Sequence, residues 1–231
     1  MHDPNRRLLE EAVQLLRPLL EELVFVGGCA TGLLITDPDS QGIRATRDVD
    51  VIVEIGSYGE YVGGFAERLR RLGLKEDSEV ICRWRKGDLI IDVMPTSPDA
   101  LGFTNRWYIS AISSAIDVEV AGSDIRLIAP EYFLATKLEA FHGRGKGDYS
   151  GSHDLEDVVA VIDGRPEIVL EVRDAEVDVR NYLSSSFVSL LGTRAFQDAL
   201  PGFLPPDYAS QLRRPLLVER LRALASSGDV T

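Results

Sequence analysis

The sequence is poor in cysteine and histidine. It has 2 cysteines and 3 histidines among 231 residues, too few for a disulfide framework or for a zinc site with Cys/His spacing. A reducing, cytoplasmic setting is therefore expected. Residues 1–4 lack the basic patch and apolar run of a signal peptide, and no apolar stretch approaches the ~18 residues of a membrane span. We accordingly predict neither a secretory leader nor a membrane partner.

Basic residues are also scarce. Lysine and arginine total 25 against 37 aspartates and glutamates, so the formal net charge is -12. That balance argues against a protein that coats nucleic acid through charge alone, but it suits one that gathers carboxylates around metal ions. The length fits one large domain or two small ones, and the 45% apolar and 27% charged content is typical of a globular protein.

Hydrophobic periodicity divides the chain into a mixed α/β domain at residues 1–129 and a helical domain at residues 130–231. Strands are expected at residues 23–26, 48–54, 79–85, 88–94, 117–120 and 125–128, with hairpin turns at Lys86-Gly87 and around residues 121–123. Helices are expected at residues 8–22, 29–35, 57–73, 130–141, 153–163, 166–190, 193–200 and 206–226. The predicted fold class is α+β, a mixed sheet with flanking helices followed by a helical C-terminal region.

The segment Asp48-Val49-Asp50-Val51 carries two carboxylates on a predicted strand. Because alternate strand residues share a face, Asp48 and Asp50 point the same way. Two carboxylates on one face repel each other unless a cation or a donor neutralises them, and Mg²⁺, which prefers oxygen ligands, is the natural partner. The alternative is that one aspartate ends a loop while the other is solvated at a sheet edge.

A third carboxylate, Asp92, interrupts the apolar strand expected at residues 88–94. A lone aspartate in such a run is costly if it is buried without a partner. If its strand lies beside that of Asp48 and Asp50, three carboxylates converge and can hold two metal ions for phosphoryl or nucleotidyl transfer. The alternative places Asp92 in solvent on an edge strand or at the cap of a turn.

The pair Gly27-Gly28 separates a predicted strand from a predicted helix. Glycines permit close backbone approach, and the N–H groups at a helix start attract phosphate. Residues 27–32 also loosely match a dinucleotide fingerprint with acids about 20 residues further on. However, Cys29 would replace the middle glycine of that fingerprint and crowd the pyrophosphate. A dinucleotide-dependent oxidoreductase is therefore the less favoured alternative.

Taken together, Gly-Gly, then Asp-x-Asp on a strand, then a lone Asp on a later strand resembles the nucleotidyltransferase fold of the DNA polymerase β superfamily. The resemblance implies a nucleotidyltransferase-like sheet and an enzyme that uses Mg²⁺, as two ions, to transfer the NMP of an NTP such as ATP to an acceptor hydroxyl. It implies that Asp48 and Asp50 ligate the metals and that Asp92 completes the site and orients or deprotonates the acceptor. The nucleotide-binding residues that it implies in this part of the chain are Gly27, Gly28 and Cys29.

The helical half sharpens the resemblance. Residues 135–141, Arg144 and residues 153–158 are similar to the lysine and aspartate motifs of AbiEii/AbiGii-type nucleotidyltransferases, a group that includes toxins of toxin–antitoxin systems. The resemblance implies that Lys137 contacts the nucleotide phosphates, that Asp157, or Asp154 one helical turn earlier, occupies the last acidic motif, and that an antitoxin is a partner. Without it, Lys137 is a solvated helix lysine, and Asp154 is an acid favoured by the helix dipole.

The acceptor is left open among a tRNA end, a protein side chain and a small molecule such as an aminoglycoside. The run Arg83-Trp84-Arg85-Lys86 would contact RNA or a base by stacking and charge, unless alternation along a strand sends these side chains to opposite faces. A second hypothesis is a non-catalytic nucleotide-binding or regulatory protein with the same fold. The intact set of three acids argues against that hypothesis.

Overall fold

The computed structural model describes residues 3–40, 42–145 and 147–228, which form two compact units. The sheet unit comprises Pro4–Ala30 and Arg44–Ala129. The helical unit comprises Met1–Asp3, Thr31–Ile43 and Pro130–Thr231, as far as these residues are described. Residues 31–43 therefore belong with the C-terminal helices, although they lie between two strands in the sequence.

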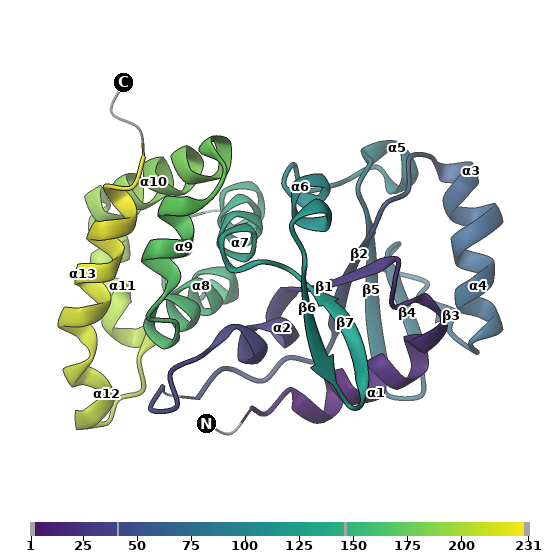
Figure 1. The fold of residues 1–231 in the computed structure, drawn as a ribbon, viewed down its shortest axis with the longest axis horizontal. Helices are drawn as coiled ribbons and strands as arrows, with labels where there is room; N and C mark the ends of the chain where they lie inside the picture. The colour runs from purple at the N-terminus through teal and green to yellow at the C-terminus, as the bar shows by residue number, and fades with distance from the viewer. Residues whose placement is uncertain (1–2, 41, 146, 229–231) are drawn as a thin grey trace. The chain divides into compact units, whose positions relative to one another are not determined.

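A mixed sheet of seven strands forms the centre of the sheet unit (Figure 1). The strands are β1 (Leu23–Val26), β2 (Val49–Val53), β3 (Lys75–Glu76), β4 (Arg83–Lys86), β5 (Leu89–Pro95), β6 (Ile116–Val120) and β7 (Ser123–Leu127). Their order across the sheet is β3-β4-β5-β2-β1-β7-β6. β2 runs antiparallel to β1 and parallel to β5, so the predicted α+β class with a mixed sheet is confirmed.

The central strands are buried because their sequences are largely apolar. All four residues of β1 are buried, and β2 buries its valines while Asp50 keeps partial exposure. Strands covered on both faces read as continuous apolar runs, which explains why this part of the sheet could be predicted. The strand expected at residues 79–85 begins later, at Arg83, because the Asp77 carboxylate accepts the N–H groups of Glu79 and Val80 and holds a turn there.

The helices of the sheet unit are short. They are α1 (Arg6–Leu16), η1 (Arg17–Leu19), the start of α2 (Gly27–Leu34), α3 (Tyr58–Glu60), η2 (Tyr61–Phe65), α4 (Ala66–Arg71), α5 (Pro98–Leu101) and α6 (Tyr108–Ser113). From Thr31 onward, α2 belongs to the helical unit. The helix predicted at residues 8–22 ends at Leu16 and tightens into a 3₁₀ turn where Pro18 interrupts it. The helix predicted at residues 57–73 contains a π-helical turn at Gly63-Gly64, two residues that weaken regular helix.

The helical unit contains the C-terminal elements. They are α7 (Pro130–Arg144), α8 (His153–Gly164), α9 (Ile168–Asp174), α10 (Val177–Gly192), α11 (Arg194–Ala199), η3 (Leu200–Phe203), α12 (Tyr208–Leu212) and α13 (Arg214–Ala225). The single helix predicted at residues 166–190 is wrong, because α9 ends at Asp174 and the extended backbone of Ala175 separates it from α10. Within the described residues, no helix is long and apolar enough to span a lipid bilayer.

Arg213 anchors the segment after α2 to the helical unit. Its guanidinium binds the Asp163 carboxylate at 2.9 Å and the Asp37 carboxylate at 2.7 Å. The carbonyl of Gly164 also accepts the backbone N–H groups of Thr36 and Asp37. Burial raises the pKa of Asp163, while its bonds to Arg213 act in the opposite direction. These bonds account for the position of residues 36–40, which the sequence alone presents as a plain loop.

Candidate active site

The three predicted aspartates occupy adjoining strands at the centre of the sheet. In the parallel pair of β2 and β5, Asp50 lies directly beside Asp92. Asp48 immediately precedes β2, two residues before Asp50, and so projects from the same face. Asp92 is 8% exposed, which rules out the alternative of a solvated aspartate on an edge strand. The strand order therefore brings the three acids together, as their pattern in the sequence suggested.

Arg83 places a positive charge beside Asp48, Asp50 and Asp92, which together form the acidic set. It lies opposite Asp92 in the antiparallel pair of β4 and β5. Its Nε and Nη2 each donate to one oxygen of Asp92 at 2.8 Å, and Nη2 also donates to Asp48 Oδ2 at 2.9 Å. The hydrogen bonds to Asp92 raise the pKa of Arg83, so the guanidinium stays charged throughout the physiological range. Sequence reasoning noticed Arg83 but did not place it beside the acids.

A second arrangement missed from the sequence holds Asp48. Thr46 donates its hydroxyl to Asp48 Oδ1 at 2.8 Å. The backbone N–H of Thr46 in turn donates to Asn5 Oδ1, and Asn5 Nδ2 donates to the carbonyl of Arg44. Asn5 is 1% exposed, so its amide is fixed in the core of the sheet unit. Asn5 thereby holds the segment from Arg44 to Thr46 at both ends. The fixed Thr46 hydroxyl in turn orients the Asp48 carboxylate.

Gly27 brings the start of α2 against Asp50. Its φ is +71°, a left-handed conformation that favours glycine. A Cβ atom at this position would lie 1.8 Å from Asp50 Oδ2. The carboxylate therefore rests on the backbone of the glycine turn, where the first N–H groups of a helix have no acceptor within the helix. Gly28 and Cys29 continue that first turn.

We expect Gly27→Ala to displace the Asp50 carboxylate. The added methyl group overlaps that side chain, and an alanine at positive φ costs about 1–2 kcal/mol of folding stability. Activity that depends on Asp50 should fall by at least about a hundredfold, the effect of a misplacement of about 1 Å. Steady-state rates and urea unfolding of the purified variant measure the two effects.

Gly122→Ala is the matched control for this change. Gly122 has φ +72° in the turn between β6 and β7, and a Cβ there would meet open space. It should lose similar stability and keep full activity. Equal losses of activity in both variants would show that backbone strain, and not contact with Asp50, explains the result.

The Cys29 side chain points into the core. It is 0% exposed, and its thiol donates to the carbonyl of Val26 at 3.6 Å. Its predicted part in nucleotide binding is therefore confined to the backbone N–H. The other cysteine, Cys82, lies beside the acidic set, and burial raises the pKa of its thiol to about 12.

The acidic set partly fits a divalent cation. Within residues 3–40, 42–145 and 147–228, no three histidine, cysteine, aspartate or glutamate side chains are placed to hold a metal ion. The Arg83 guanidinium instead pairs with both Asp48 and Asp92. Asp48 and Asp50 still share a face and offer carboxylate oxygens, the donors that Mg²⁺ prefers. The donor chemistry therefore suits Mg²⁺, with Asp92 held by the arginine.

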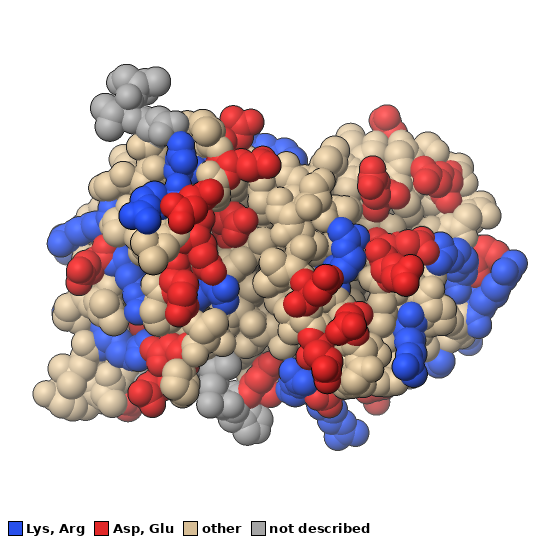
Figure 2. All heavy atoms as spheres, in the orientation of Figure 1, with Lys and Arg blue, Asp and Glu red and all other residues tan. Residues whose placement is uncertain are grey.

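The basic and aromatic run at Arg83 to Lys86 is not a stacking surface. Trp84 is 0% exposed and donates its indole N–H to the Tyr61 hydroxyl. Arg85 pairs with Asp77, and Lys86 donates to the carbonyl of Leu72. The alternation of side chains between two faces explains this run. On the face that Figure 2 shows, lysines and arginines are interspersed with acidic side chains and form no broad basic area.

The lysine and acids predicted from the helical half form an ion-pair network inside the helical unit. Lys137 Nζ on α7 lies 2.6 Å from Asp157 Oδ2 and 3.5 Å from Asp154 Oδ1 on α8. Arg144 also pairs with Asp154 at 3.0 Å. The Lys137 side chain is 10% exposed and that of Asp157 is 1% exposed. A solvated Lys137 is therefore excluded, whereas its contact with nucleotide phosphates stays a prediction.

The topology excludes the dinucleotide-binding alternative. That fingerprint belongs to a unit of two parallel strands joined by a helix. Here β2, the strand after α2, runs antiparallel to β1. The glycines at the start of α2 therefore belong to a different arrangement.

Several solved structures are similar to this chain. A nucleotidyltransferase-like antigenic protein from Paracoccidioides brasiliensis has 17% identity over 95% of this chain and 92% of that chain, with a TM-score of 0.49. The antibiotic-resistance factor ANT(2'')-Ia has 18% identity over 67% of this chain and 80% of that chain, with a TM-score of 0.42. JHP933 from Helicobacter pylori has 14% identity over 96% of this chain and 90% of that chain, with a TM-score of 0.41.

No protein-family model matches the sequence, and no curated protein matches it.

Proposed function

We propose that this protein is an Mg²⁺-dependent nucleotidyltransferase that transfers the NMP of an NTP to an acceptor hydroxyl. The observation that carries the proposal is the position of Asp50, which lies beside Asp92 across two parallel strands and against the backbone of Gly27. Acidic ligands are thus placed next to a helix start whose N–H groups attract phosphate. This combination of groups is suited to binding a polyphosphate together with its metal ion.

Each residue of the set has a distinct part in the proposed reaction. Asp48 and Asp50 would hold Mg²⁺, which when bound neutralises charge on the phosphate oxygens. The backbone N–H groups at Gly27, Gly28 and Cys29 would bind the triphosphate. The oxygens of Asp92 keep accepting capacity beyond the two bonds to Arg83, and they would orient the acceptor hydroxyl and take its proton.

The reaction is an in-line displacement at the α-phosphorus. The acceptor oxygen forms a bond to the α-phosphorus, and the bond from that phosphorus to the bridging oxygen breaks. Pyrophosphate leaves with the electron pair of the broken bond, and the hydroxyl proton passes to the carboxylate. The protein contributes mainly position and charge, because little covalent chemistry is left for side chains.

A toxin role with an antitoxin partner is part of the proposal. It rests on the likeness of Lys137, Asp154 and Asp157 to the lysine and aspartate motifs of AbiEii/AbiGii-type nucleotidyltransferases. An RNA acceptor loses the basic surface expected at residues 83–86, because Arg83 and Arg85 are ion-paired and Trp84 is buried. A protein hydroxyl or a small-molecule hydroxyl is therefore favoured over RNA.

A nucleotide-binding protein without turnover is the second candidate. One observation favours it, namely that Asp48 and Asp92 already share the positive charge of Arg83. Such a protein would bind NTP without consuming it.

The test is transfer of label from the α-phosphate. The purified chain is incubated with each α-labelled NTP, Mg²⁺ and either cell lysate, total RNA or a panel of aminoglycosides. We expect acid-stable label on an acceptor, lost on adding EDTA and absent when the γ-phosphate carries the label. Label from the γ-phosphate would indicate a kinase, and tight NTP binding without any transfer would favour the second candidate.

A further inference from the structure

Arg83 presents its guanidinium to two of the three acids. Of its five N–H groups, the one on Nε and those on Nη2 donate to Asp92 and Asp48. Among the described residues, Nη1 has no acceptor. The bidentate geometry on Asp92 is the strongest form of an arginine–carboxylate pair. Arg83 thus acts as a fixed positive charge with one amino group left for another ligand.

The position of this charge is unusual for a simple strand-to-strand ion pair. Exposed pairs of that kind contribute little to stability, but the side chains of Arg83, Asp92 and Asp48 are only 22%, 11% and 29% exposed. A partly buried guanidinium between two carboxylates removes the repulsion that would otherwise call for a cation. At Asp48 and Asp92, the guanidinium supplies the positive charge that a bound metal ion would otherwise supply.

The position of the guanidinium then limits how many metal ions the set can hold. Arg83 Nη2 donates to both Asp48 and Asp92, so this group lies between their two carboxylates. A metal ion shared by Asp48 and Asp92 would have to bind where the guanidinium already lies, against both its volume and its charge.

We propose that Arg83 replaces one of the two divalent cations, so that the acidic set binds a single ion through Asp48 and Asp50 while the guanidinium supplies the charge at Asp92. This inference rests on the proposed function, since it concerns the metal requirement of the same site. Nη1 is then the donor directed at a phosphate oxygen of the substrate. Arg83 is a positioning residue for Asp92 and a counter-charge for the transferred group.

The experiment counts Mn²⁺ ions bound to the full-length chain without nucleotide, by equilibrium dialysis and electron paramagnetic resonance. We expect the wild-type chain to bind one ion and Arg83→Gln to bind two. Arg85→Gln is the matched control, because it removes the same charge from the same strand but pairs with Asp77 outside the set. Arg83→Lys keeps the charge and should bind one ion.

The inference is overturned by two ions on the wild-type chain, by the same number on wild type and Arg83→Gln, or by no ion on either. The wild-type count decides the first of these even if the glutamine variant does not fold. Transfer of α-label by the wild-type chain is scored separately and decides the proposed function. A chain that transfers label and binds two Mn²⁺ ions would retain the function and refute the role of Arg83.

Discussion

Asp50→Asn is expected to reduce label transfer by about a thousandfold. Removing one carboxylate from a metal-binding set costs several kcal/mol of transition-state stabilisation, and about 4 kcal/mol corresponds to that factor. Asparagine keeps the volume of the side chain, so the register of β2 against β1 and β5 should be unchanged. The loss should therefore appear in kcat, with urea unfolding close to that of the wild-type chain.

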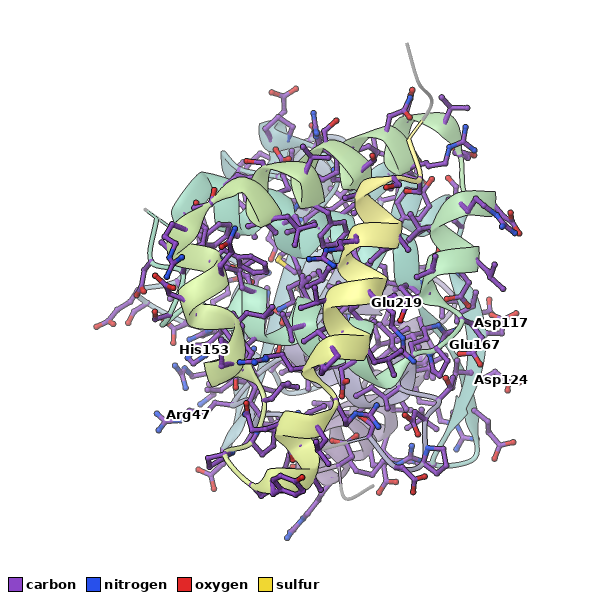
Figure 3. The ribbon with its side chains drawn as sticks, turned by 90° about the vertical axis from the view of Figure 1, so that its left-hand side faces the viewer. Arg47, Asp117, Asp124, His153, Glu167 and Glu219 are labelled. Atoms are coloured by element: carbon purple, nitrogen blue, oxygen red, sulfur yellow. The ribbon has the colours of Figure 1, made fainter. Side chains whose placement is uncertain are left out.

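Asp124→Asn is the control for charge. Asp124 lies on β7 of the same sheet and projects from it into solvent (Figure 3). Its substitution changes the net charge by the same amount as Asp50→Asn and should leave transfer within about twofold of wild type, as for a surface substitution of little effect. Undiminished transfer by Asp50→Asn would show that Asp50 is not part of the active site, and the assignment of the site would then be wrong.

The acidic set could largely be predicted from the sequence. Alternation along a strand placed Asp48 and Asp50 on one face, and Asp92 stood out as a lone charge in an apolar run. Both signals depend only on residues that are close together in the sequence, so they can be recognised without knowledge of the tertiary structure. The sequence did not show whether β2 and β5 are neighbours in the sheet. The structure shows that they form a parallel pair.

The contacts of Arg83 were not predicted because they depend on the register of β4 against β5. A turn at Lys86-Gly87 would leave Arg83 opposite Ile90. The turn is instead Gly87-Asp88, with Lys86 opposite Leu89, and this shift places Arg83 opposite Asp92. Gly87 has φ +59°, as two-residue hairpin turns require. The dipeptide Gly-Asp at residues 87–88 was the signal that could have set the register correctly.

The contacts of the helical half are mostly long-range, and few of them have a local signature. Arg213 and Asp37 are 176 residues apart in the sequence. The pattern around Lys137 indicates a helix but does not distinguish a buried lysine from an exposed one, because a long side chain can reach solvent from a half-buried position. The ion pair with Asp157 on α8 holds the Lys137 side chain in the interior of the helical unit.

Lys137→Met and Asp157→Asn are each expected to destabilise the chain by about 3–5 kcal/mol. Each leaves a buried charge without its main partner, and the cost of such a change exceeds the net value of the intact pair. The double variant should lose less than the two single variants together, with a coupling of about 0.5–3 kcal/mol. Urea unfolding followed by far-UV circular dichroism measures these losses, since Trp84 and Trp107 both lie in the sheet unit and report on that unit.

The matched control is the exposed pair of Arg194 and Asp198 on α11, whose side chains are 84% and 60% exposed. The changes Arg194→Met and Asp198→Asn should each cost less than about 1 kcal/mol, because solvent already screens that pair. The same cycle separates the two explanations of Lys137. If Lys137→Met unfolds like the wild-type chain and instead raises KM for NTP, the lysine serves the nucleotide and not the fold. A large stability loss that Asp157→Asn partly relieves in the double variant establishes the ion pair as a structural element of the helical unit.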